Sequence, residues 1–504
     1  MASKKVIVIG AGPGGLAASM QLAKAGVDVT LLEAMGRVGG RSSAIEFDGF
    51  RFDTGPTFFL YPRVLKEIFA SVGRDLFQEV PMHRLDPQYR ITFGAGGQLD
   101  CTPDFDRMEQ QVVNLSPQDA GALKRFMDDN RVKLEKFRPI LESPFNSPLD
   151  LFRPSVIRSS PYLKPWKSLG QELESYFNDP RLVIAFSFQA KYLGMSPFKC
   201  PSLFSILSFL EYEHGVFHPF GGCARVHERM AELATELGVE IRLNEPVEAL
   251  QFKGRRVTGV VTSKQTYESD AIVINADFSH AMQRLVPNHL RRRWSDAKIS
   301  KKRFSCSTFM LYLGLEGRYD QLPHHTIHIA KDYAKNLREI EVDKILPMEP
   351  SIYLHNPCIV DPSLAPQGMS TLYVLVPVPH LSKNTPWEAA QKAVFREVTL
   401  RRLEELGLTD IRSRIRFEKI LTPVDWQDDY AVYRGATFNL AHNLGQMLHL
   451  RPHNRFEELD GVHLVGGGTH PGSGLPVIYE SSRITCRQML PELGFSTSFM
   501  NPRI

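Results

Sequence analysis

Cysteine is scarce in this 504-residue sequence, and its six copies are scattered along the chain. None of them belongs to a C-x-x-C pair or to a local cluster of cysteine and histidine, so the sequence predicts neither a disulfide framework nor a zinc site. Scattered, unpaired cysteines are typical of a protein in a reducing compartment. We therefore expect a cytoplasmic location and no bound metal ion.

Long hydrophobic runs are also missing. No uninterrupted apolar segment approaches the roughly 18 residues that a membrane-spanning helix needs. A strong excess of one charge is missing too, because 60 Lys and Arg residues against 56 Asp and Glu residues leave a net charge of +4. This balance argues against nucleic acid as a partner and is compatible with anionic lipid. We therefore expect a protein that is either soluble in the cytoplasm or bound at the membrane surface.

The composition is that of a folded protein with several domains. Hydrophobic residues make up 43% of the chain and charged residues 23%, which is enough apolar side chain for a sizeable core. A length of 504 residues allows roughly two to four domains.

The N-terminal segment carries the most informative motif. Val6–Ile9 is a short β-branched run that predicts a buried strand. Gly10, Gly12 and Gly15 follow as a G-x-G-x-x-G turn that opens a predicted helix. The first glycine makes the tight turn, the second lets a pyrophosphate approach the backbone, and the third allows the helix to pack against the strand. The unit predicts a dinucleotide bound at the helix N-terminus.

Glu33 stands at the tip of the second predicted strand, where its carboxylate can accept hydrogen bonds from the hydroxyls of the adenosine ribose. A signal peptide is the competing interpretation, because Lys4 and Lys5 precede an apolar stretch of small residues. Glycines interrupt that stretch and a polar helix face follows it, so the dinucleotide interpretation is favoured.

The residues after Glu33 distinguish FAD from NAD. Arg37 to Arg41 reads R-x-G-G-R, with adjacent glycines at Gly39 and Gly40. Two adjacent glycines bring backbone N–H groups close to a ligand, and Arg41 can neutralise a second phosphate or steady a ring. The extension is similar to the FAD fingerprint of amine oxidases, protoporphyrinogen oxidases and carotenoid desaturases. We expect FAD, with a solvated basic turn as the alternative.

A second glycine-rich loop lies near the C-terminus. Residues 466–476 read GGGTHPGSGLP and precede a predicted helix. We expect Gly467 and Gly468 to contact the cofactor, while Pro476 lies where a first helical turn tolerates proline. If this loop meets the flavin, the helix dipole stabilises negative charge on the reduced ring. A plain turn between a strand and a helix is the alternative.

We expect the α/β class, with a Rossmann-type FAD-binding domain that the chain leaves and re-enters. The other two parts are a mostly helical region, which lines a substrate tunnel and associates with the membrane, and an inserted α+β substrate-binding domain. The predicted division assigns 1–100, 220–280 and 455–504 to the first part, 101–219 to the second and 281–454 to the third.

Two stretches of the helical region differ in character. Residues 139–165 are rich in proline and serine and are predicted to be an irregular surface linker. Residues 166–211 are predicted to be helical and are strongly apolar, most of all around Leu203–Tyr212. They form either ordinary core or the wall of a long apolar cavity and its opening to a membrane.

Over nearly its whole length the sequence resembles the bacterial-type phytoene desaturases, which belong to the carotenoid and retinoid FAD-dependent oxidoreductases. Besides the N-terminal fingerprint, the resemblance rests on eight stretches, of which the last is the most diagnostic: FDTGPT (52–57), FSFQAKYLGMSPF (186–198), EYEHGVFHPFGG (211–222), LPHHTIHIA (322–330), SIYLHNPCIVDPSLAP (351–366), VLVPVPHL (374–381), RPHNRF (451–456) and HLVGGGTHPGSGLP (463–476).

The resemblance implies one non-covalent FAD, a long hydrophobic tunnel, peripheral membrane binding and stepwise introduction of double bonds into an acyclic polyene. It also implies that Val247 contacts the adenine through its backbone, and that Asp150 and Arg153 occupy the positions of the family's proposed acid–base pair. An ordinary surface ion pair is the alternative for these two residues. Because only one nucleotide fingerprint is present, we expect quinone or oxygen, rather than a nicotinamide, to accept the electrons.

The sequence departs from the family at two places where we expect residues to determine which substrate fits. Phe58–Tyr61 is bulky and aromatic, and Cys223–Arg225 replaces the usual small residues after a glycine pair. Either change would narrow or shorten the tunnel, so phytoene, a C30 precursor, a ζ-carotene-stage intermediate and a cyclised carotenoid all stay open. Two other functions stay open as well: a carotenoid cis–trans isomerase that uses reduced flavin without net turnover of electrons, and an amine-oxidase-like enzyme for a polar substrate.

Overall fold

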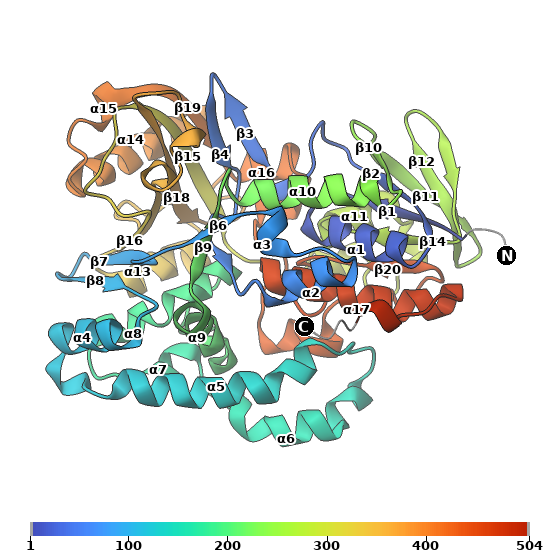
Figure 1. Ribbon diagram of the computed structural model, residues 1–504, viewed down its shortest axis with the longest axis horizontal. Helices are drawn as coiled ribbons and strands as arrows, with labels where there is room; N and C mark the ends of the chain where they lie inside the picture. Colours follow the sequence, from blue (N-terminus) through green and yellow to red (C-terminus); the bar gives the residue numbers. More distant parts are fainter. Residues whose placement is uncertain (1–3, 501–504) are drawn as a thin grey trace.

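The computed structural model describes residues 4–500 and has a mixed α/β fold with two main sheets. In Figure 1 a parallel sheet lies on the right, a larger mixed sheet stands on the left, and a layer of helices closes the bottom. The α/β class and the Rossmann-type arrangement of the parallel sheet agree with the sequence prediction.

The parallel sheet has five strands in the order β10-β2-β1-β14-β20, and every neighbouring pair is parallel. Helix α1 (Pro13–Lys24) connects β1 to β2 and completes the predicted N-terminal unit. After β2 the chain returns to this sheet three times, at β10, β14 and β20, which lie within the predicted segments 220–280 and 455–504. The strands span Glu240–Arg242, Asp28–Leu32, Lys5–Ile9, Ala271–Ile274 and Val462–Leu464.

Both faces of the parallel sheet are covered, which explains why its central strands β1 and β14 are almost wholly apolar. Val6 and Val8 pack toward helices α1, α10 and α17, whereas Ile7 and Ile9 pack toward the small sheet β11-β12-β13 and helix α11. These covering elements are α10 (Cys223–Glu236), α17 (Leu475–Leu493), β11 (Val247–Lys253), β12 (Arg256–Thr262), β13 (Thr266–Glu268) and α11 (Phe278–Leu285).

The mixed sheet has seven strands in the order β19-β15-β18-β17-β16-β7-β8, and only β16 and β7 run parallel. Strand β7 and all but the last residue of β8 lie within residues 1–100, which we assigned to the FAD-binding domain, yet both strands pair in this sheet. The strands span Ile415–Leu421, Ser307–Glu316, Met369–Val378, Ile352–His355, His325–Ile329, Tyr89–Phe93 and Gln98–Cys101.

The helical layer includes a helix that the sequence did not predict. Residues 139–165, expected to be an irregular linker, contain the end of α5 (Ala122–Leu141) and all of α6 (Pro154–Leu163). Pro154 lies at the first position of α6, where a missing N–H costs nothing, so proline here starts a helix. The other helices of this layer are α4 (Phe105–Leu115), α7 (Leu169–Leu173), α8 (Pro180–Ala185) and α9 (Ser205–His214).

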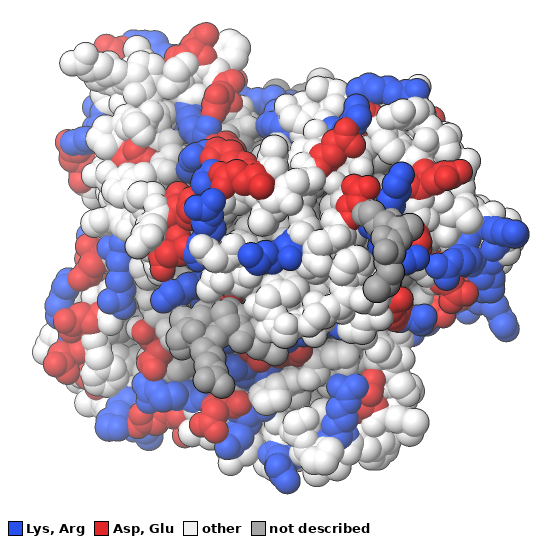
Figure 2. Space-filling model, turned by 45° about the vertical axis from the view of Figure 1, so that its right-hand side comes forward, with Lys and Arg blue, Asp and Glu red and all other residues white. Residues whose placement is uncertain are grey.

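The surface carries both signs of charge. Figure 2 shows Lys and Arg interspersed with Asp and Glu over the face that it draws. Among residues 4–500, no helix is long and apolar enough to cross a bilayer. The six cysteines are all buried and none forms a disulfide.

Candidate functional site

A single large cavity joins the two glycine-rich loops to the helical layer and the seven-stranded sheet. Its volume is about 740 Å³, in the upper part of the range for small-molecule sites. One end is lined by glycines and polar groups of the nucleotide-binding domain. The other end is lined mainly by apolar side chains, among them Leu134, Phe137, Phe188, Leu203, Phe204, Ile206, Leu207, Leu210, Met310, Ile327, Ile329, Leu375, Phe438 and Met447.

The first glycine turn has the geometry that a pyrophosphate cradle needs. Gly10 has φ +96°, which side-chain-bearing residues rarely adopt. A Cβ on Gly15 would lie 2.1 Å from the Gly10 carbonyl oxygen, so helix and turn pack too closely for any side chain. At Gly12, which lines the cavity, the only atom within 4 Å of such a Cβ is Asn275 Nδ2 at 3.1 Å. Gly12 therefore keeps the backbone open to the cavity.

Glu33 lines the cavity at the end of β2 and is buried. Its carboxylate accepts hydrogen bonds from the N–H groups of Ala11 (2.7 Å) and Met35 (2.8 Å). Burial raises the pKa of Glu33, while those N–H groups partly offset the shift. Each carboxylate oxygen can accept a further bond, so Glu33 can also receive ribose hydroxyls.

The R-x-G-G-R segment runs along the same end of the cavity. Gly39 and Gly40 have φ +98° and +54°, and the Gly39 N–H donates to the Ala11 carbonyl. Gly40 and Arg41 line the cavity, and the Arg41 guanidinium donates to the Thr437 carbonyl at 2.5 Å. The segment is therefore tied to the glycine turn, with a cation beside it.

Val247 begins β11 and lines the cavity, while its contact with an adenine stays a prediction. Its backbone pairs with Thr262 across the small sheet. Gly467 and Pro476 also line the cavity, on the loop between β20 and α17 and in the first turn of that helix. Gly468 does not line the cavity and packs closely against other residues, since a Cβ there would lie 2.6 Å from Phe278 Cβ and 2.9 Å from Asn439 Oδ1.

Two residues that the sequence did not single out hold this second loop. Arg451 is fully buried, and its guanidinium donates to four carbonyl oxygens, those of Gly467 and of three residues nearby (Leu440, Gln446 and Thr469). Burial lowers the pKa of Arg451 to about 9. His442 lines the cavity and accepts a hydrogen bond at Nε2 from the Ser473 N–H (2.9 Å). The sequence gave no signal that these two residues contact the loop at 466–476.

These observations fit a flavin dinucleotide. The open backbone at Gly12, the N-terminus of α1, a carboxylate at the strand tip and an arginine beside paired glycines supply what a pyrophosphate and a ribose require. The second loop and the N-terminus of α17 line the same cavity.

Asp150 and Arg153 form the predicted pair, with 2.6 Å between Oδ1 and Nη2, but neither lines the cavity. Oδ2 of Asp150 accepts the N–H groups of Asn146 and Ser147, which closes a capping box. Burial acts to raise the pKa of Asp150, but these N–H groups and the Arg153 charge together lower it. Their catalytic role therefore stays a prediction.

Glu480 is a carboxylate of the cavity that the sequence analysis did not single out. It lies in α17, is 3% exposed, and pairs with Arg483 at 2.9 Å. Burial raises the pKa of Glu480 to about 7, and the Arg483 charge offsets only part of the shift. A carboxylate with a pKa near neutrality is suited to accept or release a proton at neutral pH.

The chain has full-length relatives of known activity. A profile described as flavin containing amine oxidoreductase matches residues 13–490. The chain is 42% identical to the 4,4'-diapophytoene desaturase (4,4'-diapolycopene-forming) of Methylomonas sp, covering 96% of this chain and 95% of that one. It is 38% identical to the all-trans-zeta-carotene desaturase of Myxococcus xanthus, covering 97% and 94%.

Two solved structures share the fold at low sequence identity. An oxidoreductase from Methanosarcina mazei superposes with a TM-score of 0.63 at 16% identity, covering 96% of this chain and 100% of that one. Putrescine oxidase superposes with a TM-score of 0.60 at 16% identity, covering 98% and 99%.

Proposed function

The chain belongs to the flavin-containing amine oxidoreductases and, within them, to the carotenoid desaturases, and on that premise we propose that it uses FAD to introduce double bonds into an acyclic C30 polyene of the 4,4'-diapophytoene class. One observation carries the proposal: a single cavity connects the dinucleotide loops to a long apolar wall. The 42% identity to a 4,4'-diapophytoene desaturase and the bulky Phe58 in the cavity favour C30 over C40.

FAD, when bound, supplies the hydride acceptor that this chemistry requires. Each new double bond removes a hydride and a proton from the two carbons that it joins. The two electrons then pass to a terminal acceptor, for which we propose a membrane quinone or oxygen.

The chain's own residues bind and orient the cofactor. The α1 N-terminus with Gly10, Gly12 and Gly15 holds the pyrophosphate, and Glu33 accepts the ribose hydroxyls. Gly39, Gly40 and Arg41 support the phosphates from the side, and the Val247 backbone contacts the adenine. The α17 N-terminus, with Gly467 and Pro476, stabilises negative charge at its end of the cavity, while Gly468 supports the loop from behind.

The apolar wall binds the polyene and excludes water. A hydrocarbon offers no hydrogen-bonding groups, so its affinity comes from burial of apolar surface at about 25 cal/mol per Å². An amine substrate would instead need a polar cavity, which the apolar side chains of α9 and the seven-stranded sheet do not provide. The amine-oxidase alternative is therefore disfavoured.

Two carboxylates compete for the proton that leaves the substrate. Asp150 and Arg153 are the pair implied by the resemblance, but the Asp150 carboxylate is part of a capping box with Ser147. Glu480 lines the cavity and has the higher pKa. Substitution and pH dependence separate the two, as described below.

We propose that the protein meets the membrane through α6 and the residues beside it. The helix α9, around Leu203–Tyr212, which we expected at a membrane opening, lines the cavity or is buried instead. Exposed apolar side chains gather along residues 149–166: Leu149, Phe152, Ile157, Tyr162 and Trp166. In Figure 1, α6 lies at the lower edge of the molecule. An apolar strip with nearby Lys and Arg residues suits the interface of an anionic bilayer.

Anaerobic incubation of the flavin-loaded protein with liposomes tests the function. Vesicles carry either 4,4'-diapophytoene or phytoene, and polyene absorbance and flavin absorbance are followed together. We expect the C30 substrate to gain conjugation and the flavin to lose its absorbance faster than with the C40 substrate. Turnover of phytoene alone would contradict the C30 assignment, and turnover of neither would contradict the proposed substrate class.

A further inference from the structure

Three buried histidines meet outside the cofactor and substrate cavity, although no two are neighbours in the sequence. His218 lies in β9 (Val216–Pro219), His324 immediately precedes β16, and His355 ends β17. Each offers one ring nitrogen that lies within 4.8 Å of those of the other two. We propose that His218, His324 and His355 bind a divalent transition-metal ion of the Zn²⁺ class, which fastens β9 to the seven-stranded sheet.

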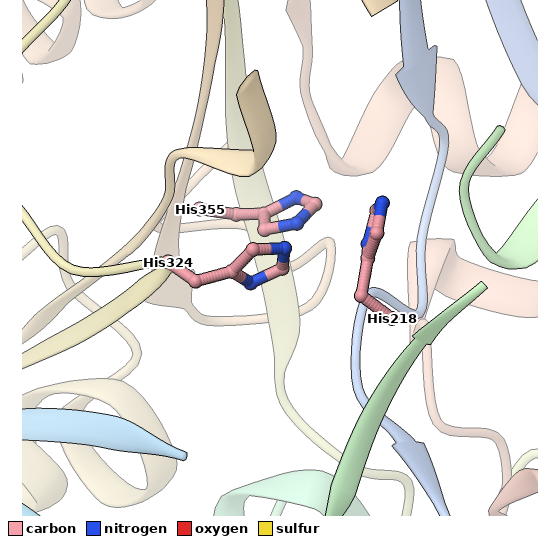
Figure 3. A group of neighbouring side chains, drawn as sticks. All are labelled: His218, His324 and His355. Carbon is pink, nitrogen blue, oxygen red and sulfur yellow. The ribbon is translucent and has the colours of Figure 1, made fainter. Parts of the chain in front are cut away.

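The rings present their nitrogens to a common centre. Figure 3 shows the rings of His324 and His355 side by side, with nitrogen atoms toward the ring of His218. The centroid of His324 lies 4.7 Å from that of His218 and 4.8 Å from that of His355. Three imidazoles converging on one point from three strands or strand ends are the ligand set of many His₃ zinc sites.

Four ring nitrogens of this group lack a hydrogen-bond partner in the described part of the chain. Among residues 4–500, no hydrogen bond is made by Nδ1 of His218, by either nitrogen of His324, or by Nε2 of His355. All three side chains are at least 97% buried, with exposed fractions of 0%, 2% and 3%. Buried polar atoms without partners are costly, and a metal ion would satisfy one on each ring.

The second nitrogen of His218 is oriented by a carboxylate. Asp361 Oδ2 lies 3.4 Å from His218 Nε2, which leaves Nδ1 free for the metal. Asp361 is itself fixed by the Gly221 N–H (2.7 Å) and the Ser363 hydroxyl (2.5 Å). Metal-binding histidines commonly donate their other N–H to a carboxylate in this way.

Two further histidines lie beside the group, His325 next to His324 and His83 next to His218. His325 Nε2 also lacks a partner among the described residues, while its Nδ1 lies 2.7 Å from the Tyr353 hydroxyl. His83 is exposed and pairs with His218 across β6 (Met82–Arg84) and β9, so both side chains project from the same face.

The site is structural, because none of its three histidines lines the cavity in the described part of the chain. It links β9, which within residues 4–500 pairs only with β5 (Phe59–Leu60) and β6, to two neighbouring strands of the seven-stranded sheet. Loss of the ion should loosen this junction without removing the flavin.

The test uses untagged, full-length protein stripped with a chelator, dialysed against Zn²⁺ or Co²⁺, and measured by elemental analysis and absorbance. We expect about one equivalent of Zn²⁺ per chain, a higher Tm with Zn²⁺, and visible d–d bands of tetrahedral Co²⁺. The variants His218→Gln and His324→Gln should lose the metal and the Tm shift. His328→Gln is the matched control, since His328 lies in β16 and its Nδ1 bonds to Thr92.

Absence of stoichiometric metal from the wild-type protein after loading would overturn the proposal, as would equal binding by His324→Gln. If a variant does not fold, the Co²⁺ spectrum of the wild-type protein still decides between histidine ligation and no site. Flavin content is measured in parallel, so failure of the metal site is distinguishable from loss of the cofactor.

Discussion

Replacing Gly12 by leucine separates cofactor binding from folding, because this glycine faces the cavity while its backbone is unstrained. Its φ is −73° and ψ is 175°, which any L-residue adopts. A Cβ would meet only Asn275 Nδ2, at 3.1 Å, so the fold must shift by a few tenths of an ångström at one flexible amide. The rest of the side chain would occupy the cavity where we place the pyrophosphate.

The substitution should cost less in free energy of folding than in free energy of flavin binding. Gly12 is the N-cap of α1 without a side-chain cap, and leucine is a poor N-cap residue, so the fold should lose about 1 kcal/mol. Overfilling a binding site by even a methylene or two costs about 1–3 kcal/mol, or about 5- to 150-fold in Kd. A leucine adds four carbons, so we expect flavin retention to fall by at least about 100-fold.

The assay measures flavin absorbance per mole of purified protein, together with Tm. Gly445→Leu is the control, because Gly445 is exposed and a Cβ there meets only Asn443 Oδ1 at 3.4 Å. Gly15→Ala is the opposite comparison: its Cβ would lie 2.1 Å from the Gly10 oxygen, so folding itself should suffer. Full flavin absorbance in Gly12→Leu would refute the assignment of the N-terminal loop.

Three further predictions concern the proton, the membrane and the substrate. If Glu480 accepts the proton, the rate of anaerobic flavin bleaching should fall as pH drops through about 7, because the carboxylate is then protonated, and Glu480→Gln should remove this step. If Asp150 accepts it, the rate should stay flat in that range, since its pKa is lowered, and Asp150→Asn should slow bleaching at unchanged flavin content. In liposome flotation the protein should rise with anionic vesicles, and replacing Phe152 and Trp166 by serine should leave it at the bottom; flotation unchanged by this double substitution would contradict the α6 surface. Phe58, which stacks on His325 at 4.1 Å and lines the cavity, restricts its width, so Phe58→Leu should raise turnover of phytoene relative to the C30 substrate, as measured by product ratios in mixed vesicles.

The elements that carry the first glycine loop and Glu33 were predictable because their signals are local. Strand, glycine turn, helix and acidic strand tip follow one another within residues 4–41, and each has a period or a turn residue that identifies it. The two glycine loops then meet because the carboxyl ends of β1 and β20 lie at the same edge of one parallel sheet. The sheet topology therefore brings these local motifs together at one site.

The remaining features depend on contacts that sequence spacing does not reveal. Arg451 and His442 support the second loop from other segments, and the three metal-site histidines come from segments that are far apart in the sequence. Residues 154–163 were expected to be irregular on proline and serine content, yet Pro154 begins α6 because proline suits a first helical turn.

The most direct test of the account is a single anaerobic turnover with oxidised, flavin-loaded protein and vesicles that contain 4,4'-diapophytoene. We predict that the flavin bleaches once and stops, that one equivalent of a more conjugated polyene forms, and that bleaching and product formation resume when quinone or oxygen is added but not when a nicotinamide is added. A product that is only a geometric isomer, formed with the flavin reduced at the start and at the end, would contradict the desaturase and leave the isomerase.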